Sequence, residues 1–280
     1  AAAVGGFLGA SVAVALTRGV NRGLYSNEAG QGSAPIAHAT SKTENPIEEG
    51  MVSILEPFID TIVVCTLTGL VILSSGVWNQ KFENEFEASA MDYLKGSYSE
   101  TSSEEDLITL RNYYYDRNEN IEFTGELNVS EGVLTSEDVT LMHNRSFAED
   151  TTYITSDTNQ KFSGVITVKE GKITNPGDFI IEGKSLLRSA DLTGKAFTKS
   201  VFGEYGQYIV AFGLLLFAFS TVIAWSYYGD RATAHLFGEG WILYYRIVYV
   251  GAFFIAAVVD TKIIWDIATV IGPIATIPNL

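Results

Sequence analysis

The chain has 280 residues, a formal net charge of −15, and 18% charged residues beside 47% hydrophobic ones. Its pI is near 4.6 and it has no cluster of Lys and Arg to neutralise phosphates, which argues against nucleic acid as a partner. The only cysteine, Cys65, lies in an apolar run, so disulfides play no part. The charges are segregated, because 22 acidic and 12 basic residues lie between Gly76 and Ser200. The composition therefore predicts membrane-embedded flanks around a soluble middle.

The first apolar run, Ala1–Leu24, is long enough for most of a membrane crossing, which takes roughly 20 residues. A polar stretch, Arg22–His38, follows it, and four glycines interrupt any continuous helix: Gly19, Gly23, Gly30 and Gly32. Asn27-Glu28 is typical of a new helix start. Unwound backbone at membrane depth persists only where it is buried in protein or lines a polar cavity. The stretch is therefore a candidate binding site in a broken helix, although a Gly-rich loop before a soluble helix fits the spacing equally well.

A short amphipathic piece, 29–41, and a polar connector, 42–49, lead to a second expected span, Ile54–Trp78. This span contains Asp60, and a carboxylate near the membrane interior is costly. We favour a structural, helix-positioning role for Asp60 over cation or proton coupling. For Glu28 we likewise favour helix capping over coupling.

From Asn79 to Arg188 the sequence has the character of a soluble domain. Residues 81–95 are charged with a possible helical period, whereas 123–134 and 162–173 repeat one pattern of strand, Glu-Gly turn and strand. Val139–His143 and Tyr153–Thr155 could add strands. We therefore expect a small antiparallel β domain inserted between two membrane spans.

The insert offers little chemistry. His143 is isolated among polar residues, and no His, Cys or carboxylate cluster has the spacing of a metal site. We interpret the insert as an interaction or shielding module whose ligand is unknown.

The next expected span is Tyr205–Gly229, which carries no formal charge. Within it, Thr221 and Trp225 fall on one helical stripe. Hard cations prefer oxygen ligands, and the hydroxyls of Ser220 and Thr221 with the carbonyl of Phe217 could supply them. Helix packing, in which Ser and Thr are common, is the favoured explanation of this pattern taken alone.

A turn at 229–235 and two further apolar runs, 241–259 and 263–280, complete the chain. Arg231 and His235 favour a cytoplasmic position for the turn, and alternation of the spans then places the insert outside the cytoplasm. The chain starts without Met and stops soon after the last apolar run begins, so we expect it to be a fragment.

Four motifs in order resemble one transporter family: Arg22–His38, Phe58–Thr66, Phe217–Gly229 and Ile277–Asn279. Together they are similar to the alanine or glycine:cation symporter family, the sodium:alanine symporters. The likeness covers about 1–78 and 189–280, and in the family the loop that carries the insert is usually much shorter.

The resemblance implies an α-helical membrane transporter with a leucine-transporter-like inverted-repeat fold, of which this chain holds the second repeat with its one discontinuous helix. The domains would be a transmembrane 1–78 with the sixth and seventh helices, a β-rich extracytoplasmic insert at 79–188, and a transmembrane 189–280 with the eighth, ninth and start of the tenth. The N-terminal repeat of the same protein would be a missing partner.

The resemblance also implies the sites. The substrate pocket would be lined by residues of the break and one of the later span: Tyr25, Ser26, Asn27, Gly30 and Trp225. Na⁺ would bind at Ser220, Thr221 and the Phe217 carbonyl. The expected function is sodium-coupled symport of a small neutral amino acid, alanine or glycine, across the plasma or inner membrane, with Na⁺ as coupling ion, no other cofactor and no enzymatic step.

Two alternatives remain open. Proton-coupled amino-acid transport through Asp60 or Glu28 would depend on pH rather than on Na⁺. A membrane-anchored surface protein acting through the β insert would lose its function on deletion of 79–188 and would tolerate mutation of the helix break.

Overall fold

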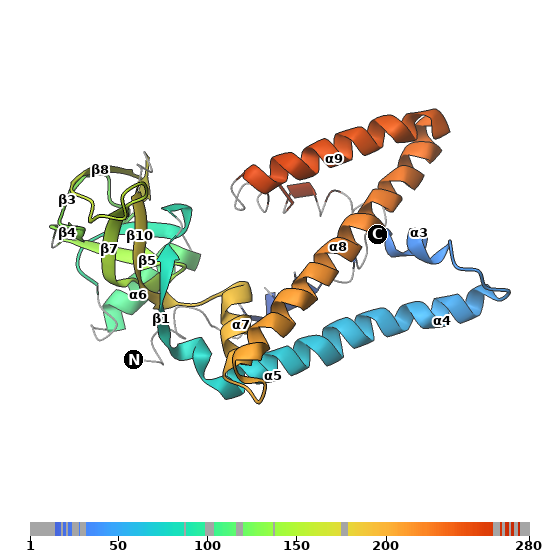
Figure 1. Cartoon of the computed structure of the whole chain (residues 1–280), viewed down its shortest axis with the longest axis horizontal. Helices are drawn as coiled ribbons and strands as arrows, with labels where there is room; N and C mark the ends of the chain where they lie inside the picture. The colour runs from blue at the N-terminus through green and yellow to red at the C-terminus, as the bar shows by residue number, and fades with distance from the viewer. Residues whose placement is uncertain are drawn as a thin grey trace. The chain divides into compact units, whose positions relative to one another are not determined.

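The computed structural model describes residues 15–17, 19–20, 22–23, 28, 32–86, 88–98, 104–115, 120–136, 138–174, 179–259, 264, 267–268, 270–271 and 274. Contacts between residues divide the chain into two units (Figure 1). One, the β unit, contains Ile72–Ser200, and the other, the helical unit, contains Leu16–Val71 and Val201–Leu280. The domain boundaries at 78 and 188 stay predictions, and the contacts place the seven residues before 79 and the twelve residues after 188 in the β unit as well.

In the helical unit, a short helix α3 (Ala34–His38) precedes a long one built from α4 (Pro46–Pro57), the π-helix η1 (Phe58–Val64) and α5 (Cys65–Ser75). The expectation that this span begins at Ile54 is wrong. Asn45 caps the helix by accepting a hydrogen bond from the Ile47 N–H at 3.1 Å, and Pro46 occupies the first helical position. Asn followed by Pro is a strong helix start, and it outweighs the polar character of the connector.

The long helix changes its hydrogen-bond pattern directly after Pro57. Proline has no N–H, so the bond that residue 57 would donate to Ser53 is missing. The seven residues Phe58–Val64 form a π-helix, at the end of which the Cys65 N–H donates to the Asp60 carbonyl. Asp60 therefore lies in a π turn, a feature that is frequent at functional sites.

The second half of the helical unit consists of α8 (Gly206–Phe237), the short 3₁₀ turns η4 (Gly203–Tyr205) and η5 (Glu239–Trp241), and α9 (Ile242–Val258). The turn expected at 229–235 is wrong, because α8 continues through it to Phe237. That stretch holds a single Gly and no Pro, and an isolated Gly is tolerated in a helix. The chain turns at Gly238, whose φ of +89° suits glycine, and α8 and α9 diverge from this point (Figure 1).

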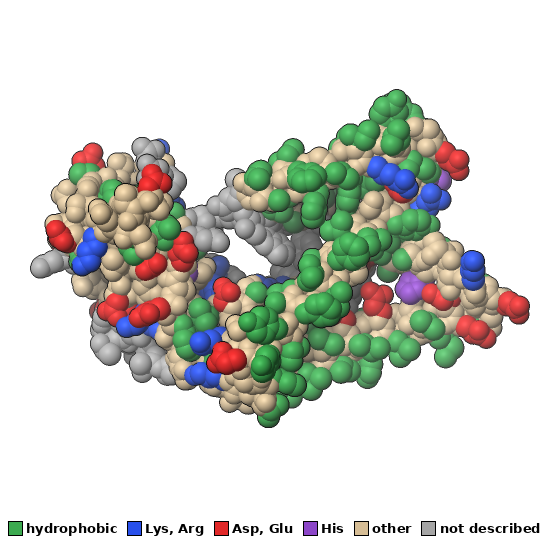
Figure 2. Space-filling view, in the orientation of Figure 1, with side chains coloured by type: hydrophobic (Ala, Val, Ile, Leu, Met, Phe, Trp, Pro, Cys, Tyr) green, Lys and Arg blue, Asp and Glu red, His purple; other side chains and the backbone are tan. Residues whose placement is uncertain are grey.

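Three of the described helices are long and apolar enough to cross a membrane: Pro46–Ser75, Gly203–Phe237 and Glu239–Val258. Their large hydrophobic side chains are exposed, and Figure 2 shows these side chains gathered over α4, α5, α8 and α9. Such a surface would be unfavourable in water, whereas lipid or neighbouring apolar helices can cover it.

The β unit holds three antiparallel sheets, with strand orders β1-β10-β7, β2-β5-β6 and β4-β3-β8-β9. The strands are β1 (Lys81–Phe86), β2 (Met91–Lys95), β3 (Gly125–Ser130), β4 (Val133–Leu134), β5 (Val139–His143), β6 (Ser146–Phe147), β7 (Glu149–Thr155), β8 (Gly164–Lys169), β9 (Lys172–Ile173) and β10 (Phe179–Leu186). The helical pieces are η2 (Val77–Asn79), η3 (Ala88–Ala90), α6 (Glu104–Tyr115) and α7 (Ser189–Thr198).

The two repeated patterns are confirmed as hairpins, β3–β4 and β8–β9. Both turns have positive φ at two successive residues, 52° and 79° at Glu131-Gly132 and 49° and 72° at Glu170-Gly171. This is the geometry of tight hairpin turns that match the strand twist. The helical period suggested for 81–95 is wrong: this stretch forms β1 and β2, because alternate side chains such as Phe86 and Tyr93 enter the core of the sheets.

The core of the β unit is apolar with a few paired polar groups. The hydroxyls of Tyr93 and Tyr153, both fully buried, lie 2.9 Å apart and satisfy each other. His143 is also buried, stacks on Phe86 with ring centroids 4.1 Å apart, and shares a 2.8 Å hydrogen bond with Ser185. Burial, reinforced by the charge of Arg188, lowers the pKa of His143 to about 4. His143 therefore has the partners of a neutral structural histidine.

Candidate substrate and cation sites

The residues expected to hold the substrate fall mostly outside the described part of the chain. Tyr25, Ser26, Asn27 and Gly30 are not described, whereas Glu28 is. Glu28 has a φ of +52°, and its carboxylate accepts a 2.6 Å hydrogen bond from the Ser33 hydroxyl. The next described helix, α3, begins only at Ala34. The described bond of Glu28 is thus to a side chain of the segment that leads into α3.

Glu28 also reaches α8. The segment that leads from Glu28 packs against α8, where Glu28 lies near enough to Tyr228 for their charges to interact, and the Tyr228 ring lies 6.1 Å from the ring of Trp225, centroid to centroid. Trp225 is the α8 residue expected in the substrate pocket, and its side chain is 44% exposed. The helical unit therefore brings a residue of the predicted break next to the predicted aromatic wall, although the two are far apart in the sequence.

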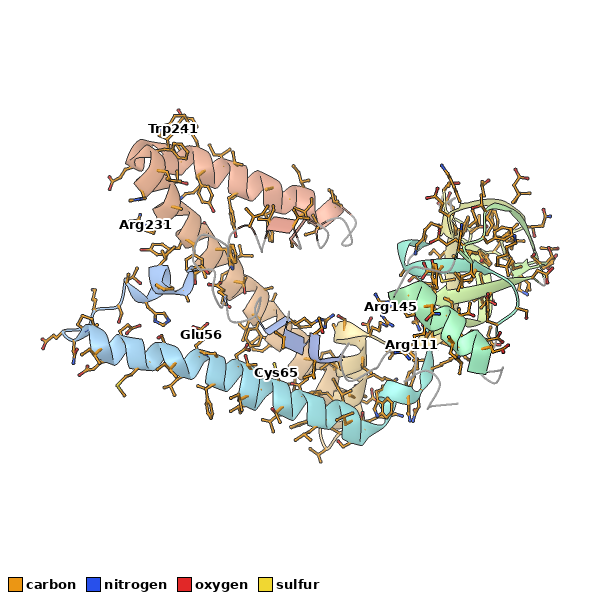
Figure 3. All side chains as sticks on the ribbon, turned by 180° about the vertical axis from the view of Figure 1, so that it is seen from behind. Glu56, Cys65, Arg111, Arg145, Arg231 and Trp241 are labelled. Atoms are coloured by element: carbon orange, nitrogen blue, oxygen red, sulfur yellow. The ribbon has the colours of Figure 1, made fainter. Side chains whose placement is uncertain are left out.

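A histidine ties α3 to α4. The His38 Nδ1 atom lies 2.7 Å from the Glu49 carboxylate, and its Nε2 atom lies 3.7 Å from that of Glu56. Ser41 donates a second 2.7 Å hydrogen bond to Glu49. Glu49 and Glu56 are seven residues apart, so they share one face of α4. Figure 3 shows Glu56 on the side of α4 toward α3.

The candidate cation ligands lie on an exposed face of α8. The Ser220 hydroxyl donates to the Phe217 carbonyl over 3.0 Å, and Thr221 is the next residue along the helix. Hard cations accept oxygen ligands at about 2.4 Å, so two oxygens this close can contact the same ion. The arrangement also satisfies the Ser220 hydroxyl without an ion, as in ordinary helix packing. Among the described residues, no three His, Cys, Asp or Glu side chains could hold a metal ion.

An ion pair joins α8 to α9. The Arg246 guanidinium donates to both oxygens of the Asp230 carboxylate, at 3.1, 3.1 and 2.6 Å. The Asp230 side chain is 5% exposed and the Arg246 side chain 58% exposed. Nearby, the Tyr249 hydroxyl donates to the Val222 carbonyl over 3.0 Å. The sequence signal for the ion pair was two opposite charges inside otherwise apolar helices.

Gly229 lets α9 approach α8 closely. A Cβ atom at this position would overlap the phenol of Tyr245, whose hydroxyl lies 3.5 Å from the Trp225 carbonyl. The glycine that suggested a turn is thus a contact point between two helices.

Helices that are long and apolar enough to cross a membrane, with their apolar side chains exposed, are those of a membrane protein. The family model described as the sodium:alanine symporter family matches residues 1–102 and 164–280. The chain therefore belongs to the sodium:alanine symporter family, a family of transporters rather than enzymes.

Named relatives agree with this membership. The chain is 26% identical to an uncharacterized transporter of Haemophilus influenzae over all of its own length and 38% of that protein. It is 28% identical to the sodium/alanine symporter AgcS of Methanococcus maripaludis, over 97% of the chain and 37% of that protein. Over 28% of the chain it is 47% identical to the probable sodium/glutamine symporter GlnT of Bacillus subtilis, 15% of which is covered. The chain thus spans well under half the length of these relatives, and no solved structure matches it.

The family match leaves residues 103–163 unmatched. This stretch holds helix α6 and strands β3 to β7. Much of the β unit is therefore outside the family pattern, whereas the helical segments with the candidate sites are inside it.

Proposed function

We propose that the protein is a sodium-coupled symporter of a small neutral amino acid, such as alanine or glycine, in the plasma or inner membrane. Its fold would be of the leucine-transporter type, with this chain as the second inverted repeat and a first repeat of the same protein completing the sites. Transport proceeds by alternating access, in which ligands shift the balance between states that bind them with different affinity.

The observation that carries this proposal is the packing of α3 against α8, with Glu28 near Tyr228 and Tyr228 beside Trp225. It supports a pocket in which the break supplies backbone groups and Asn27 for the substrate carboxylate, since freed N–H groups at half-helix ends bind carboxylates. Tyr25 and Trp225 limit the size of the substrate side chain. Ser26 and Gly30 complete the wall contributed by the break.

The cation site in this proposal consists of the Ser220 and Thr221 hydroxyls and the Phe217 carbonyl. Its support is the 3.0 Å separation of two of these oxygens on an exposed face of α8. Na⁺ bound there ties α8 to the first repeat and favours the outward-open state.

The test is uptake of labelled alanine by the full-length protein in proteoliposomes. The double variant Ser220→Ala/Thr221→Ala loses the stimulation by Na⁺. A matched control is Ser53→Ala, because the Ser53 hydroxyl makes the same kind of bond, 2.8 Å to the Gly50 carbonyl, on α4. Unchanged Na⁺ dependence in the double variant would refute the cation site.

A second candidate function is proton-coupled transport. The observation that favours it is the placement of His38 between Glu49 and Glu56, since an imidazole between two carboxylates has the geometry to pass a proton from one to the other. In this case a pH gradient drives uptake without Na⁺, and His38→Gln abolishes it. His235→Gln, at an exposed histidine of α8, is the control.

The insert is proposed to lie outside the cytoplasm. Arg231, near the α8–α9 turn (Figure 3), favours a cytoplasmic position for that end of α8, which places the other end and the β unit's connection across the membrane. Protease added to sealed, right-side-out vesicles then cleaves within 79–188. Protection of this segment until the vesicles are opened would reverse the orientation.

A further inference from the structure

The β unit is acidic as a whole, but several lysines gather at one end of it. Between Gly76 and Ser200 the chain has 22 acidic and 12 basic residues. At the end where the chain enters and leaves the unit, a hollow of about 410 Å³ has three lysines in its lining. We call it the lysine hollow, and it is lined by Lys81, Phe82, Glu83, Lys184, Leu187 and Lys195.

Two ammonium groups of the α7 region gather over one aromatic ring. Lys195 and Lys199 place their Nζ atoms 5.3 and 5.5 Å from the centroid of the Phe82 ring. Lys199 also donates a 2.7 Å hydrogen bond to the Gln80 side chain. Both lysines are exposed, one turn apart on the same helical face. Among the described residues, neither has a carboxylate within ion-pairing distance.

The other two lysines of the cluster are already paired. Lys81 bonds Glu149 over 2.6 Å, and Lys184 bonds Asp150 over 2.7 Å. Glu83 adds a negative charge to the lining, and Asp191 lies one turn before Lys195 on α7. The positive charge available to an outside anion is therefore that of Lys195 and Lys199.

The chain on both sides of this cluster joins membrane helices. One candidate span ends at Ser75, six residues before Lys81, and another begins at Gly203, four residues after Lys199. Even fully extended, these connections reach at most about 21 and 14 Å. Within the β unit, the η2 turn and α7 pack against each other, so the two connections leave together. The lengths of these connections limit how far the lysines can lie from the ends of the two candidate spans, and Trp78, in the first connection, is an aromatic residue of the kind typical of the headgroup level.

From this placement we propose that Lys195 and Lys199, with Phe82 beneath them, bind the phosphate of an anionic lipid headgroup and thereby seat the β unit on the membrane. The proposal concerns lipid and is independent of the transported substrate. An acidic domain is otherwise repelled by an anionic bilayer, so two lysines without a carboxylate partner provide the complementary charge at this place.

The test is native mass spectrometry of the full-length protein in neutral detergent, titrated with phosphatidylglycerol or phosphatidylcholine. The wild-type protein binds phosphatidylglycerol more tightly, and Lys195→Gln/Lys199→Gln weakens that binding by about thirtyfold, because each lysine near a membrane surface contributes about fivefold. Lys161→Gln/Lys169→Gln, at two exposed lysines of the sheet, leaves it unchanged. Single Lys199→Gln, at the exposed C-cap of α7, weakens binding by about fivefold.

Equal affinity of the wild-type and Lys195→Gln/Lys199→Gln proteins for phosphatidylglycerol would overturn the proposal. An equal loss in the Lys161/Lys169 control would also overturn it, because the attraction would then depend on total charge alone. Displacement of the lipid by millimolar glycerol phosphate would show a site for soluble anions instead.

Discussion

The two units of this chain bury opposite kinds of side chain. In the β unit the buried residues are mostly apolar, among them Met91, Tyr93 and Ile166, and the charges lie outside. In the described part of the helical unit the one buried side chain is Asp230, paired with Arg246, while the apolar side chains are exposed. The β unit thus follows the rules of folding in water. The helical unit exposes an apolar surface that lipid or further helices can cover.

The largest effect is expected when the buried carboxylate of the helical unit loses its ion-pair partner. Arg246→Gln leaves the Asp230 carboxylate, 5% exposed, without its partner. Removing one member of a buried ion pair costs about 3–5 kcal/mol. We expect the thermal unfolding of the full-length protein in detergent to shift down strongly, with loss of alanine uptake.

The control for this variant is Glu239→Gln, at an exposed turn position. Asp230→Asn should cost less than Arg246→Gln, because the Arg246 side chain is 58% exposed and can be solvated. Equal effects of the two substitutions would contradict the buried-carboxylate explanation.

In the β unit the stability is expected to depend on pH through the buried, neutral His143. Its pKa of about 4 lies below the value of about 6.5 in an unfolded chain, so the unfolded state binds more protons between these values. Stability of the β unit is therefore complete above pH 6.5 and falls as the pH drops toward 4, by up to about 3 kcal/mol.

Hydrogen exchange of strand β5 at several pH values, corrected for intrinsic exchange, measures this effect. His143→Gln should flatten the pH dependence in this window. The same pH dependence in wild type and variant would mean that another group is responsible.

A smaller effect is expected at the contact of α8 with α9. Gly229→Ala places a methyl group against the Tyr245 phenol, and overpacking of this kind costs about 1–3 kcal/mol. Tyr245→Leu should restore much of the loss in the double variant. Gly213→Ala, at an α8 glycine with open space around it, should be neutral. Thermal unfolding in detergent measures the stability of all three variants.

An effect of similar size is expected in the core of the β unit. Tyr93→Phe leaves the buried Tyr153 hydroxyl without its 2.9 Å partner, at a cost of about 1–3 kcal/mol. The double variant Tyr93→Phe/Tyr153→Phe removes both polar groups and should recover most of that loss. Protection of β2 and β7 amides from exchange measures it. A double variant as unstable as the sum of the two singles would contradict pairing of the hydroxyls.

The features predicted correctly from the sequence are those with a local signal. Three of the apolar runs correspond to helices that are long and apolar enough to cross a membrane, and the two Glu-Gly turns correspond to the hairpins. The runs 1–24 and 263–280 lie mostly outside the described residues. The wrong predictions concern places where a helix cap or a contact between helices outweighed the polarity of the local sequence. Asn45-Pro46 starts a helix although acidic residues follow it, and Asp230 is tolerated inside α8 because Arg246 on another helix pairs with it.

In the candidate site, too, contacts within one helix could be predicted from the sequence and contacts between helices could not. The Phe217 carbonyl and Ser220 hydroxyl are three residues apart, so their proximity follows from helix geometry alone. The proximity of Glu28 to Tyr228, and the pairing of His38 with Glu49 and Glu56, depend on how separate helices pack. No periodicity in the sequence encodes these contacts.

The measurement that tests the central claim most directly is uptake of labelled alanine and glycine by the full-length protein in proteoliposomes, with and without an inward Na⁺ gradient at fixed pH. We expect saturable uptake of at least one of them that requires the Na⁺ gradient. Uptake that is equal in the two conditions and follows an imposed pH gradient would contradict sodium coupling and assign the driving force to protons.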